Sequence, residues 1–167
     1  VAVVDMLEHV PDDAAFAAEL ARVTKPGGRL VVNTPHLKRT ALRRLRHALG
    51  QTDEKHGHLR PGYTPERLRE LFGSGVAMGR HRTYSRFFSE LVDTAINVTL
   101  ERMGKKSSAK GMVVTGSDLA RHRKTFRLWS LLYPVIWAVT RLDALVPASG
   151  YMLIAQAERK SPPGPSH

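Results

Sequence analysis

Apolar positions open the chain with a strand, a helix and a second strand. Residues 1–4 and 29–33 are short runs with continuous apolar centres. Such runs are typical of parallel strands that are covered on both faces. Between them, residues 12–24 carry apolar side chains at helical spacing, which predicts a helix whose inner face includes Leu20 and Val23.

The rest of the chain continues this alternation of helical and extended patterns. Thr64 and Pro65 form a helix start, because a hydroxyl caps the first turn and proline suits its first position. The full pattern predicts helices over 37–49, 64–72, 86–103 and about 119–142, and strands over 76–84 and 151–157. We expect residues 104–118 to form a loop and 161–167 a disordered tail. This order of elements indicates the α/β fold class.

The predicted helix over 86–103 has an apolar stripe that we expect to be buried. The side chains on or near this stripe are Phe87, Leu91, Ala95, Val98 and Met103. Their spacing is that of one helix face, so the sequence predicts an apolar contact along the whole helix.

The charge of the chain is strongly basic and unevenly distributed. The net charge is +11, yet residues 1–28 hold five acidic and two basic residues, so the remainder carries +14. Such a balance attracts nucleic acid, anionic lipid or phosphorylated substrates, and a solvated arginine-rich surface is an equally good interpretation. Nucleic acid is the weakest of these partners, because no known motif is present and no aromatic residue interleaves the basic cluster at 38–46.

An uncharged apolar segment, residues 128–139, lies between basic flanks. It contains Trp129 and Trp137, and it is too short to span a bilayer. Together with its flanks, as residues 121–142, it would suit an anionic membrane surface or a lid over an apolar substrate. The alternative is a helix buried in the core against residues 86–103. The chain has no cysteine, which excludes disulfides and thiolate metal sites.

Two motifs near the start of the chain carry a family resemblance. They are D-M-L-E-H-V-P-D, residues 5–12, and E-L-A-R-V-T-K-P-G-G-R-L-V-V-N-T-P, residues 19–35. The pair resembles the fourth and fifth strands of class I S-adenosylmethionine (SAM)-dependent methyltransferases of type 11. The resemblance implies the C-terminal part of a Rossmann-like fold, with a mixed sheet in the order 4-5-7-6 and its last strand antiparallel between two neighbours. Residues 1–160 would then be a partial methyltransferase domain with a helical insertion at about 86–142.

The same resemblance implies where the cofactor would bind. The family holds SAM with a Gly-rich loop and an acidic residue that precede these motifs, and no G-x-G-x-G motif occurs in the chain. We therefore expect the first half of the domain to be missing. The residues implied to line the SAM pocket are Val4, Asp5, Met6 and Leu7. Met6 and Leu7 have an alternative role as core residues.

Candidate metal ligands and a candidate proton acceptor lie close to these motifs. Asp5, Glu8 and His9 resemble the E-x-x-E-H motif with which some ubiquinone-pathway O-methyltransferases bind a divalent metal. We favour the alternative, in which Glu8 and His9 support the junction between strand and helix. His58 lies in G-H-L-R-P-G-Y-T-P-E-R-L-R-E-L-F, residues 57–72, which resembles the family's segment before its last helix. His36, His56 and His58 are loop histidines, and His58 is the candidate general base unless it is only a surface residue.

These observations favour methyl transfer from SAM to a small-molecule acceptor, lipid-linked or quinone-like. The alternative is a non-catalytic module, derived from the same fold, that binds a membrane or another partner. The expected location is the cytoplasm, either free or at the inner face of the membrane. The sequence leaves the acceptor atom and the oligomeric state open.

Overall fold

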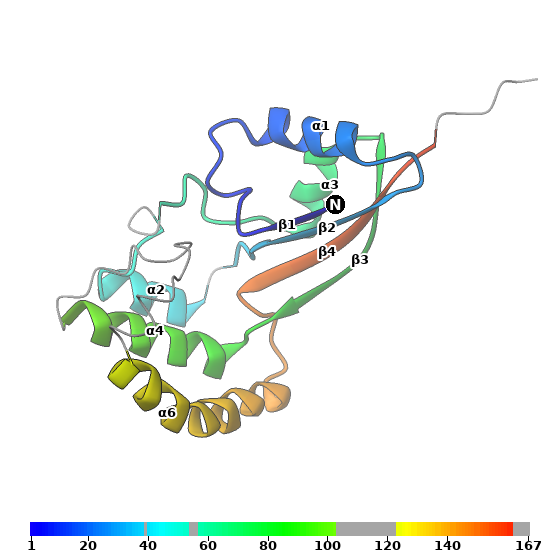
Figure 1. Cartoon of the computed structure of the whole chain (residues 1–167). Helices are drawn as coiled ribbons and strands as arrows, with labels where there is room; N and C mark the ends of the chain where they lie inside the picture. Colours follow the sequence, from blue (N-terminus) through cyan, green and yellow to red (C-terminus); the bar gives the residue numbers. More distant parts are fainter. Residues whose placement is uncertain (39, 54–56, 103–122, 162–167) are drawn as a thin grey trace, which may run out of the picture. The chain divides into compact units, whose positions relative to one another are not determined.

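The computed structural model describes residues 1–38, 40–53, 57–102 and 123–161 as two compact units (Figure 1). The first unit comprises Val1–Thr40, Thr52–Tyr84 and Ser149–His167. The second comprises Ala41–Gln51 and Ser85–Ala148. The predicted loop over 104–118 and most of the predicted tail, 162–167, lie outside the described residues, as do His56, Met103 and positions 121 and 122.

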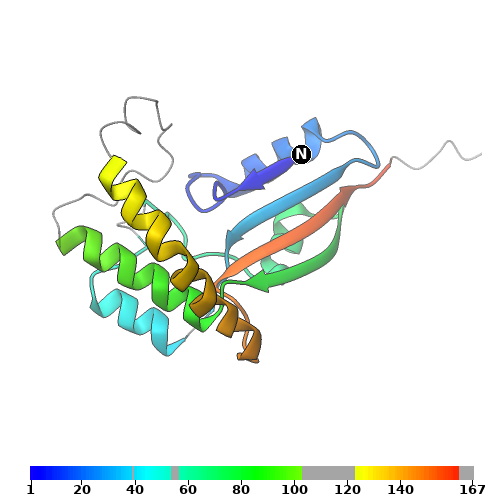
Figure 2. The same cartoon turned by 60° about the horizontal axis from the view of Figure 1, so that its bottom comes forward.

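The first unit is built on a four-stranded mixed sheet (Figure 2). Its strands are β1 (Ala2–Val4), β2 (Arg29–Pro35), β3 (Val76–Tyr84) and β4 (Met152–Arg159), in the spatial order β1-β2-β4-β3. β1 pairs parallel with β2, whereas β4 pairs antiparallel with both of its neighbours. The expected antiparallel insertion of the last strand is therefore confirmed.

Two helices, α1 (Asp13–Val23) and α3 (Pro65–Phe72), cover one face of this sheet (Figure 1). The Asp12 side chain begins α1 and the Thr64 hydroxyl begins α3. Each accepts a hydrogen bond from the backbone N–H three residues further on, over 2.8 and 3.2 Å. These caps satisfy N–H groups that have no partner within the helix. Both helix starts agree with the sequence prediction.

The hydrophobic core lies between these helices and the sheet. Its buried side chains are Val3, Leu7, Ala17, Leu20, Leu30, Val32, Tyr63, Leu68, Phe72, Val76, Leu153, Ala155 and Ala157. Residues along β4 alternate between buried and exposed, and Val31 on β2 stays partly exposed, so the expected cover on both sheet faces is not seen. The prediction for Val23 is also wrong, because this last residue of α1 is 49% exposed.

The second unit consists of helices. They are α2 (Ala41–Ala48), α4 (Phe87–Arg102) and α6 (Arg123–Arg141), followed by the short 3-10 helix η3 (Leu142–Leu145). Within this unit α4 lies between α2 and α6 (Figure 2). The predicted helix over 37–49 starts later than expected, because the N–H of Leu37 still bonds to the carbonyl of Tyr63 in extended backbone.

The buried face of α4 is polar, which corrects the apolar stripe expected there. Glu90, Thr94 and Asn97 are only 3%, 4% and 5% exposed, whereas Phe87 and Leu91 are 46% and 39% exposed. Hydrogen bonds within the helix make this arrangement tolerable, since the Thr94 hydroxyl donates to the Glu90 carbonyl and the Asn97 amide donates to Asp93.

Candidate functional site

The candidate site lies where β1 and β2 end. Because these strands are parallel, their carboxyl ends meet at one edge of the sheet, where open α/β sheets bind ligands. Asp5 follows β1 in the left-handed backbone region, with φ of 48°, and its N–H donates to the Asn33 carbonyl over 3.0 Å. Asp tolerates this region better than most residues. The chain therefore turns away from the sheet directly after Val4.

A chain of hydrogen bonds crosses this edge from β3 to the end of β1. The Tyr84 hydroxyl donates to Oδ1 of Asn33 over 2.7 Å, and Nδ2 of Asn33 donates to Oδ1 of Asp5 over 3.1 Å. Burial raises the pKa of Tyr84, so its hydroxyl stays neutral and acts as a donor. The Asp5 carboxylate is thus oriented by Asn33.

Glu8 is a buried acid beside this series of hydrogen bonds. Its side chain is 1% exposed, and the Thr34 hydroxyl donates to its Oε2 over 3.1 Å. Burial raises the pKa of the Glu8 carboxyl, against the hydrogen bonds that favour its charged form. Glu8 therefore holds its proton to higher pH than an exposed glutamate does.

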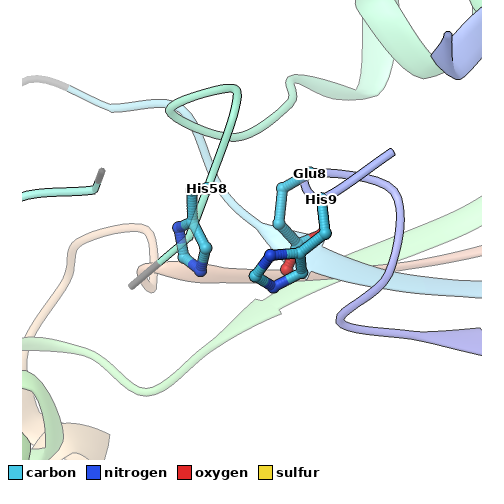
Figure 3. Close-up of side chains that lie close together, drawn as sticks. All are labelled: Glu8, His9 and His58. Carbon is cyan, nitrogen blue, oxygen red and sulfur yellow. The ribbon is translucent and has the colours of Figure 1, made fainter. Parts of the chain in front are cut away.

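His9 and His58 bring two imidazoles together from distant parts of the chain (Figure 3). Their ring centroids are 4.8 Å apart, and the rings meet edge to face at 78°. Nδ1 of His9 lies 2.8 Å from the Gly57 carbonyl oxygen. A carbonyl can only accept, so Nδ1 of His9 carries a hydrogen and donates it to Gly57.

Glu8, His9 and His58 are also the group that could approach a metal ion. One ligand atom from each lies within 4.8 Å of the others. Two ligands of one Zn²⁺ ion, each about 2.1 Å from it, are separated by at most about 4.2 Å, so this group would have to contract. The structure places His58 here rather than Asp5, which the sequence analysis had grouped with Glu8 and His9.

A buried tyrosine supports the loop that carries Glu8 and His9. The Tyr63 hydroxyl donates to Oδ2 of Asp13 over 2.9 Å and lies 3.1 Å from the Leu7 carbonyl oxygen. The Arg60 guanidinium forms an ion pair with the same Asp13 carboxylate at 3.0 Å. Burial first, and then the bond to Asp13, raise the pKa of Tyr63 far above its ordinary value, so it stays neutral.

Sequence analysis missed several of these supporting residues. They are Asp13, Asn33, Thr34, Tyr63 and Tyr84. Two of them had a usable signal, because Asn33 and Thr34 are polar residues at the end of an apolar strand, where site residues of α/β sheets commonly lie. The others become visible only when segments far apart in sequence are brought together.

The residues expected to line a cofactor pocket have different environments. Val4 is 58% exposed and Met6 is 49% exposed, so both offer apolar surface beside Asp5. Leu7 is fully buried in the core, which agrees with its alternative role there. The 167 residues contain no G-x-G-x-G motif.

The loop histidine His36 is hydrogen-bonded within the fold, because its Nδ1 donates to the Gly150 carbonyl over 3.0 Å.

Comparison with known families agrees with the resemblance noted in the sequence. A family model described as "Methyltransferase domain" matches residues 1–32, the segment that forms β1, α1 and much of β2. No curated protein matches the chain. The match supports a methyltransferase domain, and the four-stranded mixed sheet fits a methyltransferase-like fold.

Proposed function

We propose that this chain forms part of a class I SAM-dependent methyltransferase that acts on a small molecule, lipid-linked or quinone-like. One observation carries the proposal. In the segment that matches the methyltransferase family, Asp5, Glu8 and His9 follow the carboxyl end of β1, the edge at which open α/β sheets bind ligands. In the family's numbering, β1, β2, β4 and β3 would be strands 4, 5, 7 and 6.

The cofactor would need a partner segment in addition to this edge. SAM would supply a methyl group on a positively charged sulfur. Val4 and Met6 offer exposed apolar contact and Asp5 an oriented carboxylate, but the sequence holds no G-x-G-x-G loop for the methionine end. We propose that such a loop is supplied from outside these 167 residues.

Within this edge the chain would position the acceptor and remove a proton from it. Orientation supplies most of the acceleration in such transfers. A general base is needed when the acceptor is a hydroxyl, and His58 is the proposed proton acceptor. His9 would hold the orientation of His58, because its own ring is anchored by the Gly57 carbonyl. Burial raises the pKa of Glu8, so its carboxyl takes up a proton more readily than an exposed glutamate does.

A divalent cation is not part of this proposal. The ligand atoms of Glu8, His9 and His58 would have to contract around an ion, and burial, which raises the pKa of Glu8, opposes the charged carboxylate that a metal ligand needs. The geometry suits a hydrogen-bonded junction between β1 and α1 better.

The test measures methyl transfer by the protein made from its complete reading frame. Purified protein is incubated with SAM labelled in its methyl group and with fractionated small molecules and lipids. We expect label to enter one fraction, and His58→Ala to lower kcat by about 100-fold or more with little change in KM. The control is His81→Ala, since His81 is an exposed histidine on β3.

Three results would contradict the proposal or one part of it. Absence of SAM binding by the protein from the complete reading frame would remove the methyltransferase assignment. Micromolar, one-to-one binding of SAM by the 167 residues alone, measured by calorimetry, would show that no outside loop is needed. If His58→Ala and His81→Ala lowered kcat equally, His58 would not be the general base.

A further inference from the structure

Helix α6 exposes an unusual amount of apolar surface. Its exposed large hydrophobic side chains, continued into η3, are Leu128, Leu131, Leu132, Tyr133, Val135, Trp137, Leu142 and Leu145. Leu131 is 75% exposed and Val135 62%. α6 packs against α4, as the core interpretation expects, but most of its described apolar side chains stay exposed. Exposed apolar groups gathered on one element mark an interaction surface.

The exposed aliphatic side chains of α6 follow the period of a helix. Leu128, Leu131 and Val135 are separated by three and four residues, so they share one face of α6. Within its own unit α6 contacts α4 and η3, and its Ile136 and Val139 side chains are partly buried. The apolar face of α6 is defined here as Leu128, Leu131, Leu132 and Val135.

Positive charge accompanies this apolar face. Helix α6 contains Arg123, Lys124, Arg127 and Arg141 and no acidic residue. The unit to which it belongs has 13 Lys and Arg against 5 Asp and Glu, which is +8 of the chain's net +11. At the end of the helix the Arg141 guanidinium lies 4.5 Å from the ring centre of Trp137. Basic groups on a helix that also exposes an apolar face suit the headgroup region of a bilayer.

The length of α6 limits how it could meet a bilayer. Among the described residues, no helix has the length and apolar character needed to cross a membrane. We propose that α6 lies in the plane of an anionic lipid surface, with its apolar face among the acyl chains and its basic residues at the headgroups. This proposal concerns the helical unit and does not depend on the methyltransferase assignment.

A second copy of the chain is the main alternative occupant of this face. Pairing two α6 helices would bring their cationic side chains together with no acidic residue on either helix to offset them. An anionic surface does the opposite, because each basic residue near it adds to binding. Charge therefore favours lipid over self-association.

The test measures binding of the full chain to sedimented vesicles. We expect stronger binding to phosphatidylcholine vesicles that contain phosphatidylglycerol than to phosphatidylcholine alone, falling as salt is raised. Both tryptophans of the chain lie in α6, so a change in their fluorescence on binding reports on this helix. The double variant Leu131→Ser with Val135→Ser should weaken binding about tenfold or more at every salt concentration.

The matched control is Val23→Ser with Leu59→Ser, two apolar residues of the first unit that are 49% and 60% exposed. Circular dichroism checks that each variant is folded, and we expect the control to bind vesicles as the wild type does. Failure to bind anionic vesicles would overturn the proposal. So would binding that the α6 variant leaves unchanged, which would indicate adsorption by charge alone. A dimer in analytical ultracentrifugation that only the α6 variant dissociates would assign the face to a second copy.

Discussion

The hydroxyl of Tyr63 donates a 2.9 Å hydrogen bond to Oδ2 of Asp13, and both side chains are buried. This bond joins the segment before α3 to the first turn of α1, fifty residues earlier in the chain. It also fixes the end of the loop that carries Glu8 and His9. The candidate site is thus held in place by a contact that takes no part in its chemistry.

Replacing Tyr63 by Phe should destabilise the fold. The change removes a hydroxyl and leaves the buried Asp13 carboxylate with its ion pair to Arg60. We expect a loss of about 1–2 kcal/mol in the free energy of unfolding, measured by urea denaturation. Tyr133→Phe removes the same atoms from a side chain that is 63% exposed and should change stability by less than about 0.5 kcal/mol. Equal effects of the two changes would contradict the role of the Tyr63 bond.

Glu8 should make the fold less stable as pH rises. Burial raises the pKa of Glu8 in the folded state. Its contribution to the free energy of unfolding is therefore fully present below the ordinary pKa of 4.5 and is lost as pH rises through the folded-state pKa. Glu8→Gln does not titrate. The stability of the wild type minus that of Glu8→Gln, from urea unfolding at several pH values, should therefore fall as pH rises above about 4.5.

Glu19→Gln provides a control of opposite sign. The hydrogen bond from Arg22 lowers the pKa of the exposed Glu19, so its contribution is present above the ordinary pKa and is lost as pH falls. The stability of the wild type minus that of Glu19→Gln should therefore rise with pH. A difference for Glu8 that is flat, or that rises with pH as for Glu19, would show that burial does not dominate at Glu8.

Local rules predicted much of the fold from the sequence. The Thr64 cap and Pro65 define the start of α3 through atoms within one helical turn, so neighbours in sequence contain the needed information. The position of β4 between β2 and β3 came from the family resemblance instead. Spacing alone could not have supplied it, because the pairing partners lie more than a hundred residues apart along β2 and β4.

The buried face of α4 shows where sequence patterns were insufficient. Phe87 and Leu91 repeat at helical spacing, but so do Glu90, Thr94 and Asn97. A helical period identifies both stripes, and packing within the unit decides which one is buried. The pairing of His9 with His58 depends likewise on a long-range backbone contact, the bond from the Leu59 N–H to the Glu8 carbonyl over 2.8 Å.

Asp143 should stabilise the start of α4, although it lies more than fifty residues later in the sequence. Its Oδ1 accepts from the Phe88 N–H over 2.7 Å and from Ser89 over 3.4 Å, and its Oδ2 accepts from the Arg86 N–H over 2.7 Å. Asp143→Ala removes all three bonds and should cost about 1–2 kcal/mol, as the loss of a helix cap does. Asp143→Asn keeps one acceptor oxygen, so its cost should be smaller. Helicity and urea unfolding measure both.

The cost of the Asp143 variants should also depend on pH. Burial raises the pKa of Asp143, but the hydrogen bonds from Ser89 and from three backbone N–H groups outweigh it, so the pKa lies below its ordinary value of 3.8. The contribution of the ionised carboxylate is complete above that value and is lost as pH falls through the folded-state pKa. The penalty of Asp143→Asn should therefore shrink in acid. A penalty that is unchanged in acid would mean that the charge of Asp143 does not contribute.

Gly150 should tolerate no side chain, because of how closely two backbone segments approach. A Cβ atom added there would overlap the backbone N, C and O atoms of Tyr84. The segment cannot easily move away, since the Gly150 N–H donates to the Thr83 hydroxyl and its carbonyl accepts from His36, each over 3.0 Å. The φ angle of Gly150 does not lie in the left-handed region, so the expected penalty is steric. Gly150→Ala should lower the free energy of unfolding by about 1–3 kcal/mol.

Gly75→Ala separates this steric effect from the general effect of replacing glycine. Nothing lies within 4 Å of a Cβ at Gly75, and its φ angle is not positive. Alanine there reduces only the freedom of the unfolded chain and should leave stability unchanged or raise it by up to about 1 kcal/mol. Urea unfolding of the two variants side by side gives the comparison. If Gly150→Ala were as stable as Gly75→Ala, the close approach of Gly150 to Tyr84 would be wrong, and with it the register that brings Tyr84 to Asn33.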